Sequence, residues 1–498
     1  MPAALAPCLM VQGSASGVGK SVIATALCQV LAEQGYRVSP FKAQNMSNNA
    51  AVTADGGEIG RAQAAQAEAA GVAPSVLMNP VLLKPEADNR SQLVLLGRAV
   101  GSYTAQEYWV RRPSIWPLIT SSLRELRRTS DVVVIEGAGS PAELNLRSRD
   151  MANMRLARHA QARVALVGDI DRGGIFAQLL GTLDLLRPEE RRLIVGLLVN
   201  RFRGDPRLFE SGVRILRRRS HLPVLGVLPY EPDLNVPDED SASLDRPRPR
   251  SVSSLRAALV AYPRVSNFDD VDPLRRAGIA IDVLQRPADL GWPDLIVLPG
   301  SKATIDDLIW LKQTGLATAI MRAAAGGVPV VGICAGYQML GESLEDPDGV
   351  DGSPRSMPGL SLLPVVTRFR SPKRTRQVQG TIAVSSALAP SGTRIVGYEI
   401  HTGITQRHGG SPFALVTGAQ DIAEEDGAVS PDGLVVGTSV HGVFADSDAI
   451  EAVVAGIARR RGIAVPNVSP SIDAGAWFRS AVDVPALISM LGWKSRSH

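Results

Sequence analysis

The sequence predicts two α/β domains, each built on a mainly parallel sheet flanked by helices. In both halves of the chain, apolar runs of strand length alternate with segments of helical apolar spacing, the pattern of parallel strands connected by helices. The stretch from 232 to 254 is rich in Pro, Asp, Ser and Arg and lacks apolar periodicity, which is typical of a linker. The length of 498 residues corresponds to two to four domains at roughly 150 residues each. We expect domains over 1–235 and 255–448, a linker over 236–254 and a helical C-terminal extension over 449–498.

A glycine-rich loop lies between a predicted strand at 8–11 and a predicted helix at 22–31. Its backbone N–H groups, together with the helix N-terminus, are suited to hold phosphate oxygens, while a lysine reaches the terminal phosphates and a serine ligates Mg²⁺. The spacing departs from the usual one, because the first glycine lies at 13 where position 14 is expected. A plain Gly/Ser-rich turn explains the glycines but not a Lys-Ser pair at the first helical turn. The candidate nucleotide-binding residues are Gly13, Ser16, Gly17, Gly19, Lys20 and Ser21.

Polar residues follow three further apolar runs. The run 132–135 ends in Glu136, the run 164–168 is followed by Asp169 and Asp171, and the run 193–199 ends in Asn200. An acid at the carboxyl end of a parallel strand beside a phosphate loop is where Mg²⁺ needs a ligand. Each acid alone is more commonly a helix cap or a solvated strand end. Their repetition favours a site at this edge of the sheet.

A second loop carries a cysteine between a short predicted strand at 328–333 and a helix that opens at 337–340. Small residues flank Cys334 on both sides, which is typical of a nucleophile elbow with cysteine in place of serine. A cysteine in an apolar run is more often inert core, and we interpret Cys8 and Cys28 in that way. His441, at another predicted strand end, is the candidate general base, although a capped surface histidine is the plainer alternative. The turn at 299–302 supplies N–H groups for an oxyanion hole.

Five runs of the chain together resemble one family. The runs 41–49, 60–63, 78–85, 168–176 and 397–403 closely resemble those of the cobyric acid synthases and occur in that family's order. The resemblance extends from about residue 8 to about residue 445, nearly the whole of a domain pair.

The resemblance assigns roles to the candidate residues. The first half resembles dethiobiotin synthetase, a P-loop NTPase-like fold whose phosphate loop has the same extra residue. By that similarity Lys20 and Ser21 contact phosphates and Mg²⁺, Lys42 lies near the transferred phosphoryl group, Glu136 is a Mg²⁺ ligand and Asn200 contacts adenine. The second half resembles the class I glutamine amidotransferases, with Cys334 as nucleophile and His441 as base.

One position departs from the wider class I pattern. Those enzymes usually carry a glutamate two residues after the histidine, and here that residue is Val443. The cobalamin-type branch characteristically lacks this acid, so the departure agrees with the resemblance. It leaves the group that orients His441 open between a backbone carbonyl and Glu399.

The resemblance implies a reaction and its participants. ATP with Mg²⁺ would activate carboxylates of adenosylcobyrinic a,c-diamide, a corrinoid, and ammonia from glutamine would amidate its b, d, e and g side chains to give cobyric acid. The nearest alternative is cobyrinic acid a,c-diamide synthase, from which the run 42–49 points away. A P-loop ATPase with a vestigial glutaminase domain is disfavoured by the intact Cys334 and His441. A non-enzymatic corrinoid carrier is the third alternative.

Composition limits location and partners. Three cysteines and the lack of a secretory or transmembrane segment predict a reduced, cytoplasmic protein. The net charge of +4 is modest, and arginine clusters at 217–219 and 246–250 are accompanied by no nucleic-acid motif. We therefore expect glutamine and a corrinoid as partners, and neither a nucleic acid nor a membrane.

Overall fold

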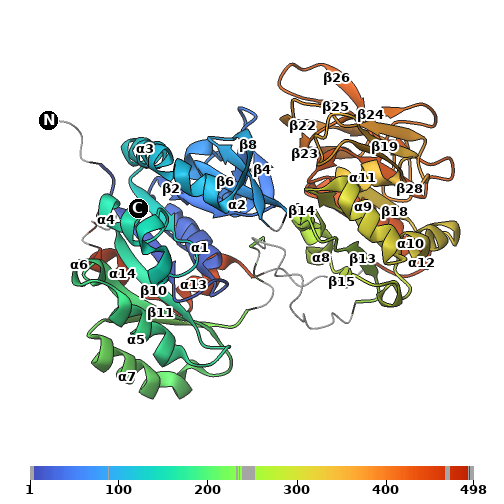
Figure 1. Cartoon of the computed structure of the whole chain (residues 1–498). Helices are drawn as coiled ribbons and strands as arrows, with labels where there is room; N and C mark the ends of the chain where they lie inside the picture. Colours follow the sequence, from blue (N-terminus) through green and yellow to red (C-terminus); the bar gives the residue numbers. More distant parts are fainter. Residues whose placement is uncertain are drawn as a thin grey trace.

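The computed structural model describes residues 5–87, 89–231, 234, 236–237, 253–465, 472–491 and 493. Two α/β bodies lie side by side, the first blue to green and the second yellow to orange (Figure 1). Each contains a six-stranded, mainly parallel sheet, so the predicted fold class is confirmed. Most of the predicted linker, 236–254, lies outside the described residues, and the domain boundaries stay predictions.

The central sheet of the first domain is wholly parallel, in the order β12-β11-β10-β1-β9-β2. Its strands are β1 (Cys8–Gly13), β2 (Val38–Phe41), β9 (Val132–Glu136), β10 (Arg163–Asp169), β11 (Ile194–Phe202) and β12 (Val224–Pro229). Because β1 lies between β9 and β10, the loop after β1 opens beside the carboxyl ends of both. The same edge carries Glu136, Asp169 and Asn200, as the sequence predicts.

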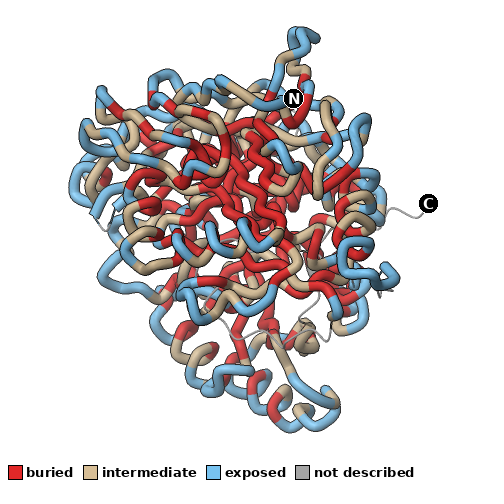
Figure 2. Tube along the Cα trace, turned by 90° about the vertical axis from the view of Figure 1, so that its right-hand side faces the viewer, coloured by how far each residue is buried: buried red, intermediate tan, exposed pale blue. Residues whose placement is uncertain are grey.

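Helices cover both faces of this sheet. They are α1 (Lys20–Glu33), α2 (Arg61–Ala69), α3 (Ala105–Thr129), α4 (Met154–Ala160), α5 (Ile175–Leu185), α6 (Pro188–Arg191) and α7 (Glu210–Ser220). Successive side chains of β1 point to opposite faces, so Cys8 and Met10 join one core while Leu9 and Val11 join the other, which contains α1. Figure 2 shows buried segments running through the middle of the molecule.

A smaller β-structure of the first domain faces the second domain. It consists of a four-stranded sheet in the order β3-β6-β7-β8 and the antiparallel pair β4-β5. The bounds are β3 (Gln44–Met46), β4 (Ala50–Val52), β5 (Glu58–Gly60), β6 (Val81–Ala87), β7 (Arg90–Leu95) and β8 (Arg98–Thr104). Ala50 and Val52 pack with Ile400 of the second domain in a small apolar cluster. The domains therefore share a buried contact at this point.

The second domain has a six-stranded sheet in the order β15-β13-β16-β18-β28-β27, parallel except for β27 at the edge. Its strands are β13 (Arg256–Val260), β15 (Ala280–Leu284), β16 (Leu295–Leu298), β18 (Val330–Ile333), β27 (Ala428–Val429) and β28 (Val435–Thr438). Its helices are the 3₁₀ turn η5 (Phe268–Val271), α8 (Asp272–Arg276), α9 (Thr304–Gln313), α10 (Leu316–Ala325), α11 (Ala335–Leu340) and α12 (Ser447–Arg461).

Three further sheets extend this domain, and the strand–helix alternation in the sequence did not predict them. They are the pair β14-β17, a mixed sheet β20-β19-β21-β24 and an antiparallel sheet β26-β25-β22-β23-β29. The bounds are β14 (Val265–Ser266), β17 (Gly300–Ser301), β19 (Ser343–Asp346), β20 (Arg355–Pro358), β21 (Val365–Arg368), β22 (Arg374–Ile382), β23 (Arg394–His401), β24 (Ile404–Arg407), β25 (Ala414–Thr417), β26 (Ala423–Asp426) and β29 (Val440–His441). The last strand carries the predicted base.

The C-terminal segment divides between the domains. Helix α12 packs Val453, Val454 and Ile457 into the core of the second domain. Helices α13 (Ala474–Arg479) and α14 (Val484–Met490) instead join the core of the first domain, where α13 packs on α1 (Figure 1). Within the described ranges, no helix has both the length and the apolar character needed to cross a bilayer.

Candidate active site

The glycine-rich loop has the geometry of a phosphate cradle. Gly19 caps α1 with φ of 97°, a left-handed conformation that favours glycine. A Cβ at Gly13 would lie 2.5 Å from the Val18 side chain, so the loop closes too tightly for any larger residue there. The Lys20 ammonium donates to the carbonyl oxygens of Ala15, at 3.0 Å, and Gly139, at 3.1 Å, and therefore lies within the loop.

Several polar side chains near this loop contact the carboxylate of Glu136. Its carboxylate is buried at the end of β9. One oxygen accepts hydrogen bonds from Ser21 Oγ at 2.9 Å and Lys42 Nζ at 2.8 Å. Three residues that the sequence places far apart, Ser21, Lys42 and Glu136, are thus brought together. Among the described residues, no cluster of three or more His, Cys, Asp or Glu side chains could hold a metal. A Mg²⁺ ion on the Ser21 hydroxyl and the Glu136 carboxylate would leave coordination positions for phosphate and water.

Two glutamines that the sequence analysis missed also contact Glu136. The other carboxylate oxygen accepts from Gln66 Nε2 at 2.6 Å and Gln63 Nε2 at 3.4 Å, both on α2. Gln63 lies in the run 60–63 that carries the family resemblance, the only signal in the sequence that pointed to it. Gln66 lies outside that run, and only its contact with Glu136 in the folded chain identifies it.

The end of β11 lies against the phosphate loop. Asn200 Nδ2 donates to the carbonyl oxygen of Val18 at 2.8 Å. The neighbouring acids are engaged by arginines: Asp169 pairs with Arg201 at 2.7 Å, and Asp171 pairs with Arg203. Asn200 is thus at the mouth of the loop, whereas Asp169 and Asp171 hold the flanking arginines.

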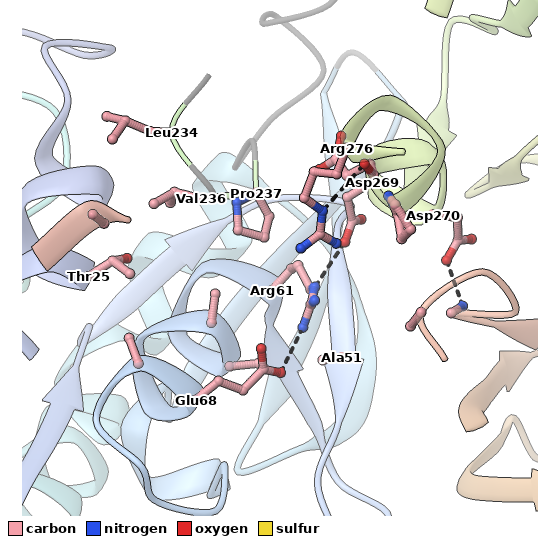
Figure 3. A pocket seen from close by; sticks show the side chains of 18 of the residues that line it. Thr25, Ala51, Arg61, Glu68, Leu234, Val236, Pro237, Asp269, Asp270 and Arg276 are labelled. Atoms are coloured by element: carbon pink, nitrogen blue, oxygen red, sulfur yellow. Dashed lines mark hydrogen bonds and ion pairs between the residues drawn. The ribbon is translucent and has the colours of Figure 1, made fainter. Parts of the chain in front are cut away.

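A large cavity extends from the phosphate loop to the second domain. Its volume is about 2320 Å³, and Gly19 and Asn200 line one side while Asp269, Asp270 and Tyr398 line another. Figure 3 shows Arg61 from the first domain pointing across this cavity to Asp269. Both domains therefore face one shared space.

Cys334 lies at a strained turn between β18 and α11. Its backbone has φ of 53° and ψ of −109°, which a non-glycine residue adopts only under constraint, and its N–H donates to the carbonyl oxygen of Thr438 at 2.8 Å. The sulfur lies 3.7 Å from the carbonyl oxygen of Ile400. The predicted nucleophile elbow is confirmed in its backbone geometry. Cys8 and Cys28 are buried core thiols, as expected, and burial raises the pKa of Cys8 to about 11 and that of Cys28 further.

His441 is held by an aspartate on η5. Its Nδ1 lies 2.7 Å from Asp270 Oδ2, and the other Asp270 oxygen accepts the N–H of Gly442 at 2.7 Å. The Cys334 thiol lies near enough to the imidazole to influence its pKa. Burial lowers the pKa of His441, but the charges of Asp270 and Cys334 outweigh burial and raise it to about 10. A protonated imidazole at this position can give its proton to a departing group.

Both alternatives that the sequence left open for orienting His441 are wrong. Glu399 does not contact the imidazole, because its carboxylate pairs with Arg376 at 2.6 Å and Arg374 at 2.8 Å. A carbonyl is not the partner of Nδ1 either, since Asp270 occupies that position. Asp270 precedes His441 by 171 residues, and a pair of acids after a short strand gave no sign of this contact.

The turn at 299–302 lies against the base. A Cβ at Gly300 would lie 3.0 Å from the carbonyl oxygen of Ser266 and 3.1 Å from His441 Cε1, so a larger residue would crowd the imidazole. The Lys302 N–H donates to the carbonyl oxygen of Arg264 at 2.9 Å. This N–H group is therefore not available to a substrate. The oxyanion role stays a prediction, now for the remaining N–H groups of this turn.

A nucleotide-binding α/β domain joined to a domain with a Cys-His-Asp nucleophile site defines an enzyme of the glutamine amidotransferase class. Two family models match: a CobQ/CobB/MinD/ParA nucleotide binding domain over residues 9–243 and a CobB/CobQ-like glutamine amidotransferase domain over residues 256–449. The chain belongs to the cobyric acid synthase family.

Three curated relatives carry this assignment, all with the name cobyric acid synthase. The protein of Sorangium cellulosum is 47% identical, covering 94% of this chain and 93% of its own. The protein of Roseiflexus castenholzii is 51% identical over 89% of this chain and 90% of its own. That of Herpetosiphon aurantiacus is 45% identical over 99% and 100%. The similarity therefore spans both domains.

Proposed function

We propose that this protein converts adenosylcobyrinic a,c-diamide to cobyric acid in the cytoplasm, with ATP, Mg²⁺ and glutamine. Residues 1–235 would carry the ATP-dependent step and residues 255–448 the glutaminase step, joined by 236–254 and followed by an extension over 449–498. The observation that carries the proposal is the pairing of a phosphate cradle with a Cys334-His441-Asp270 site around one cavity, in a chain 45–51% identical to the three cobyric acid synthases named above.

The glutaminase half-reaction follows from the second site. The Cys334 sulfur attacks the side-chain amide carbon of glutamine and forms a C–S bond. His441 then gives its proton to the departing nitrogen, the C–N bond breaks and ammonia leaves. Water hydrolyses the thioester, with His441 accepting its proton, and glutamate is released. Asp270 beside Nδ1 favours a hydrogen on that nitrogen, which would leave Nε2 to exchange the proton with the sulfur and the leaving group.

The amide-forming half-reaction belongs to the first site. A carboxylate oxygen of the substrate attacks the γ-phosphorus of ATP, ADP departs, and an acyl phosphate forms. Ammonia attacks its carbonyl carbon, the acyl C–O bond breaks, phosphate leaves with the former carboxylate oxygen, and the nitrogen loses a proton to give the amide. Mg²⁺, when bound at Ser21 and Glu136, would neutralise charge on the phosphates. Lys20 and Lys42 would hold the terminal phosphates, since both ammonium groups lie at this site.

The cavity supports a substrate of corrinoid size. Pockets for drug-sized ligands have volumes of roughly 300–1,000 Å³. The cavity here, about 2320 Å³, exceeds that range and has room for a nucleotide and a large second ligand together. Arg203 and Arg276 are among the cations that line it and would suit a substrate bearing several carboxylates.

The experiment that tests this proposal is a product analysis. Purified protein with ATP, Mg²⁺, glutamine and adenosylcobyrinic a,c-diamide should give a ladder of partly amidated corrinoids that converges on cobyric acid in mass spectrometry. Cobyrinic acid lacking the a and c amides should be a poor substrate. Preferential amidation at a and c would assign the chain to the neighbouring synthase activity. Glutamine hydrolysis without any corrinoid product would refute the substrate.

A further inference from the structure

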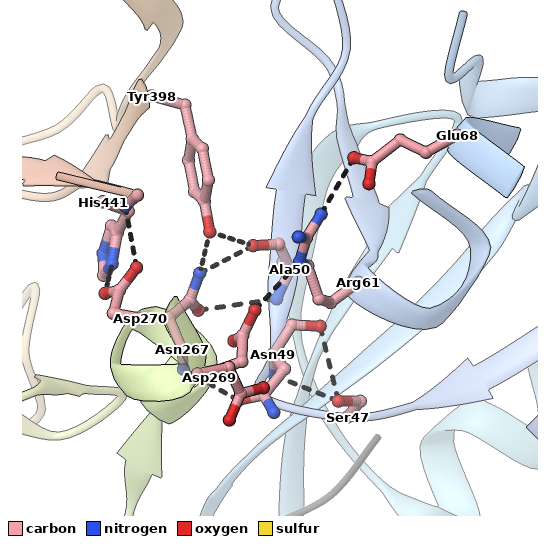
Figure 4. Close-up of polar contacts among 12 residues, drawn as sticks. Ser47, Asn49, Ala50, Arg61, Glu68, Asn267, Asp269, Asp270, Tyr398 and His441 are labelled. Carbon is pink, nitrogen blue, oxygen red and sulfur yellow. Dashed lines mark hydrogen bonds and ion pairs between the residues drawn. The ribbon is translucent and has the colours of Figure 1, made fainter. Parts of the chain in front are cut away.

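Two adjacent aspartates on η5 point to different domains. Asp270 holds His441, as described above, while Asp269 accepts a hydrogen bond from Arg61 Nε of the first domain at 2.9 Å (Figure 4). Arg61 and Asp269 are 208 residues apart, and their side chains are 24% and 7% exposed. The turn that orients the catalytic histidine is therefore held from outside its own domain.

Neighbouring contacts fix the same turn on the first domain. The Asn267 N–H donates to Asn49 Oδ1 at 2.8 Å, and Asn267 Nδ2 donates to the carbonyl oxygen of Ala50 at 2.6 Å. The Tyr398 hydroxyl donates to the same carbonyl at 3.0 Å, while its ring stacks on His441 with centroids 5.4 Å apart. Tyr398, which stacks on the imidazole, and Asn267, which precedes η5, therefore both contact the first domain at residues 49 and 50.

Arg61 has no equivalent substitute at this contact. The Oδ1 atom of Asp269 is buried and has no hydrogen-bond partner, so Arg61 is the cation that compensates this carboxylate among the described residues. Burial and the nearby charge of Asp270 raise the pKa of Asp269 to about 6 despite Arg61. Without Arg61, the consecutive carboxylates of Asp269 and Asp270 would both be buried. Among the described residues, His441 would be the one partner left to neutralise them.

Helix α2, which begins at Arg61, also contacts the nucleotide site. Arg61 is the first residue of α2, and Gln66 of the same helix donates to Glu136 at 2.6 Å. A helix of nine residues moves as one piece, since its backbone hydrogen bonds link each turn to the next. Any ligand that takes the Glu136 carboxylate competes with Gln66 for it.

We propose that Arg61 is a positioning residue for the glutaminase site, acting through Asp269 on Asp270 and His441, and that α2 couples this site to the nucleotide site at Glu136. The second half of the inference rests on the proposed ATP chemistry. The first half rests only on the contacts of Figure 4.

The first half is tested without ATP or corrinoid. Arg61→Met should lower kcat for glutamine hydrolysis by about 10- to 100-fold, because a small misplacement of a catalytic group costs this much, with little change in KM. The pH dependence of Cys334 alkylation by iodoacetamide should shift as well, and Arg61→Lys should restore part of both. The matched control is Gln377→Ala, which removes another hydrogen bond between the domains, to the carbonyl oxygen of Val52 at 3.0 Å. This control should behave as wild type.

A double-mutant cycle separates the loss of the Arg61–Asp269 contact from a general folding defect. Asp269→Asn should reproduce the loss of kcat, and Arg61→Met combined with Asp269→Asn should cost no more than either change alone. Additive losses, or an Arg61→Met protein with wild-type kcat and alkylation profile, would overturn the positioning role.

The second half is tested by the same alkylation reaction with nucleotide. Adding ATP and Mg²⁺ without corrinoid should change the alkylation rate of Cys334 by about fivefold or more in wild type, a usual size for coupling between two sites. The change should disappear in Arg61→Met. An unchanged rate in wild type that binds ATP would refute coupling through α2 and leave the positioning role intact. Absence of ATP binding would instead count against the proposed function.

Discussion

The carboxylate of Asp270 holds both the imidazole of His441 and the N–H of the following Gly442, each at 2.7 Å. One side chain thereby sets the ring orientation and the backbone that carries it. The relationship supplies the acid that the chain lacks two residues after the histidine, where Val443 stands.

Replacing Asp270 should disable glutamine hydrolysis and spare the ATP-dependent step. In Asp270→Asn the amide nitrogen would face Nδ1 and favour the wrong tautomer, so we expect kcat to fall by roughly 10²- to 10⁴-fold. Synthesis with ammonium salts should continue at a near wild-type rate. Steady-state glutamate release and corrinoid mass spectrometry measure the two activities.

Glu399→Gln is the control for this variant. Its carboxylate contacts Arg374 and Arg376 rather than His441, so hydrolysis should change little. Stability should fall by about 1.5–3 kcal/mol, the usual contribution of hydrogen bonds to charged groups. A loss of hydrolysis as large as that of Asp270→Asn, in folded protein, contradicts the assignment.

The His441 ion pair should make stability depend on pH. The folded pKa of about 10 lies above the usual value of 6.5, so the stabilisation is fully present below pH 6.5 and is lost as the pH rises through 10. The difference in melting temperature between wild type and His441→Gln should therefore shrink over this interval. A difference that stays constant from pH 6.5 to 10 would show that His441 is not stabilised as a cation.

Lys20→Ala should abolish amidation with glutamine and with ammonium salts alike. The ammonium lies in the phosphate loop, and its loss removes charge stabilisation from phosphoryl transfer. Glutamine hydrolysis at Cys334 should persist. Lys312→Ala, in α9 of the second domain, is the matched control and should retain synthesis. Ammonia-driven synthesis at the wild-type rate in Lys20→Ala would sink the assignment of this loop.

Cys334→Ser should show the opposite pattern. Glutamine-dependent synthesis should be lost because the hydroxyl is a far weaker nucleophile, while ammonia-dependent synthesis continues, since an acyl phosphate needs only free ammonia. Cys28→Ala, at a buried thiol of α1, should keep both activities. If both vanish in folded Cys334→Ser, the thiol has a role beyond glutamine hydrolysis.

The C-terminal helices should stabilise the first domain. Trp477 of α13 is 5% exposed, packs in the core that contains α1 and donates its indole N–H to the carbonyl oxygen of Pro229 at 3.0 Å. Trp477→Ala should lower the free energy of unfolding by roughly 3–5 kcal/mol in a denaturant titration. Trp292, which is 91% exposed, offers a control of the same residue type: its change to alanine should stay within about 0.5 kcal/mol.

The sequence predicted the features that local spacing encodes. The order of strand, glycine loop and helix identified Lys20 and Ser21, and a cysteine between a strand and a helix identified Cys334. In each case the apolar pattern and the reactive residue both lie in a segment of about one strand and one helix. Short-range spacing is therefore enough to identify the residue. The end of an apolar run pointed to Asn200, and the family resemblance added Lys42; the structure places Asn200 at the mouth of the phosphate loop and Lys42 beside Glu136.

Only the tertiary structure decided which distant residues meet. The fold of the second domain brings Asp270 to His441, and the packing of the two domains brings Arg61 to Asp269. No periodicity in the sequence encodes a contact across 171 or 208 residues. The same holds for Gln66 on Glu136 and for α13 and α14, whose apolar side chains join the core that contains α1 rather than the domain that precedes them. A sequence specifies that such a face must be buried, since exposed apolar surface is costly in water, but the choice of partner depends on the whole fold.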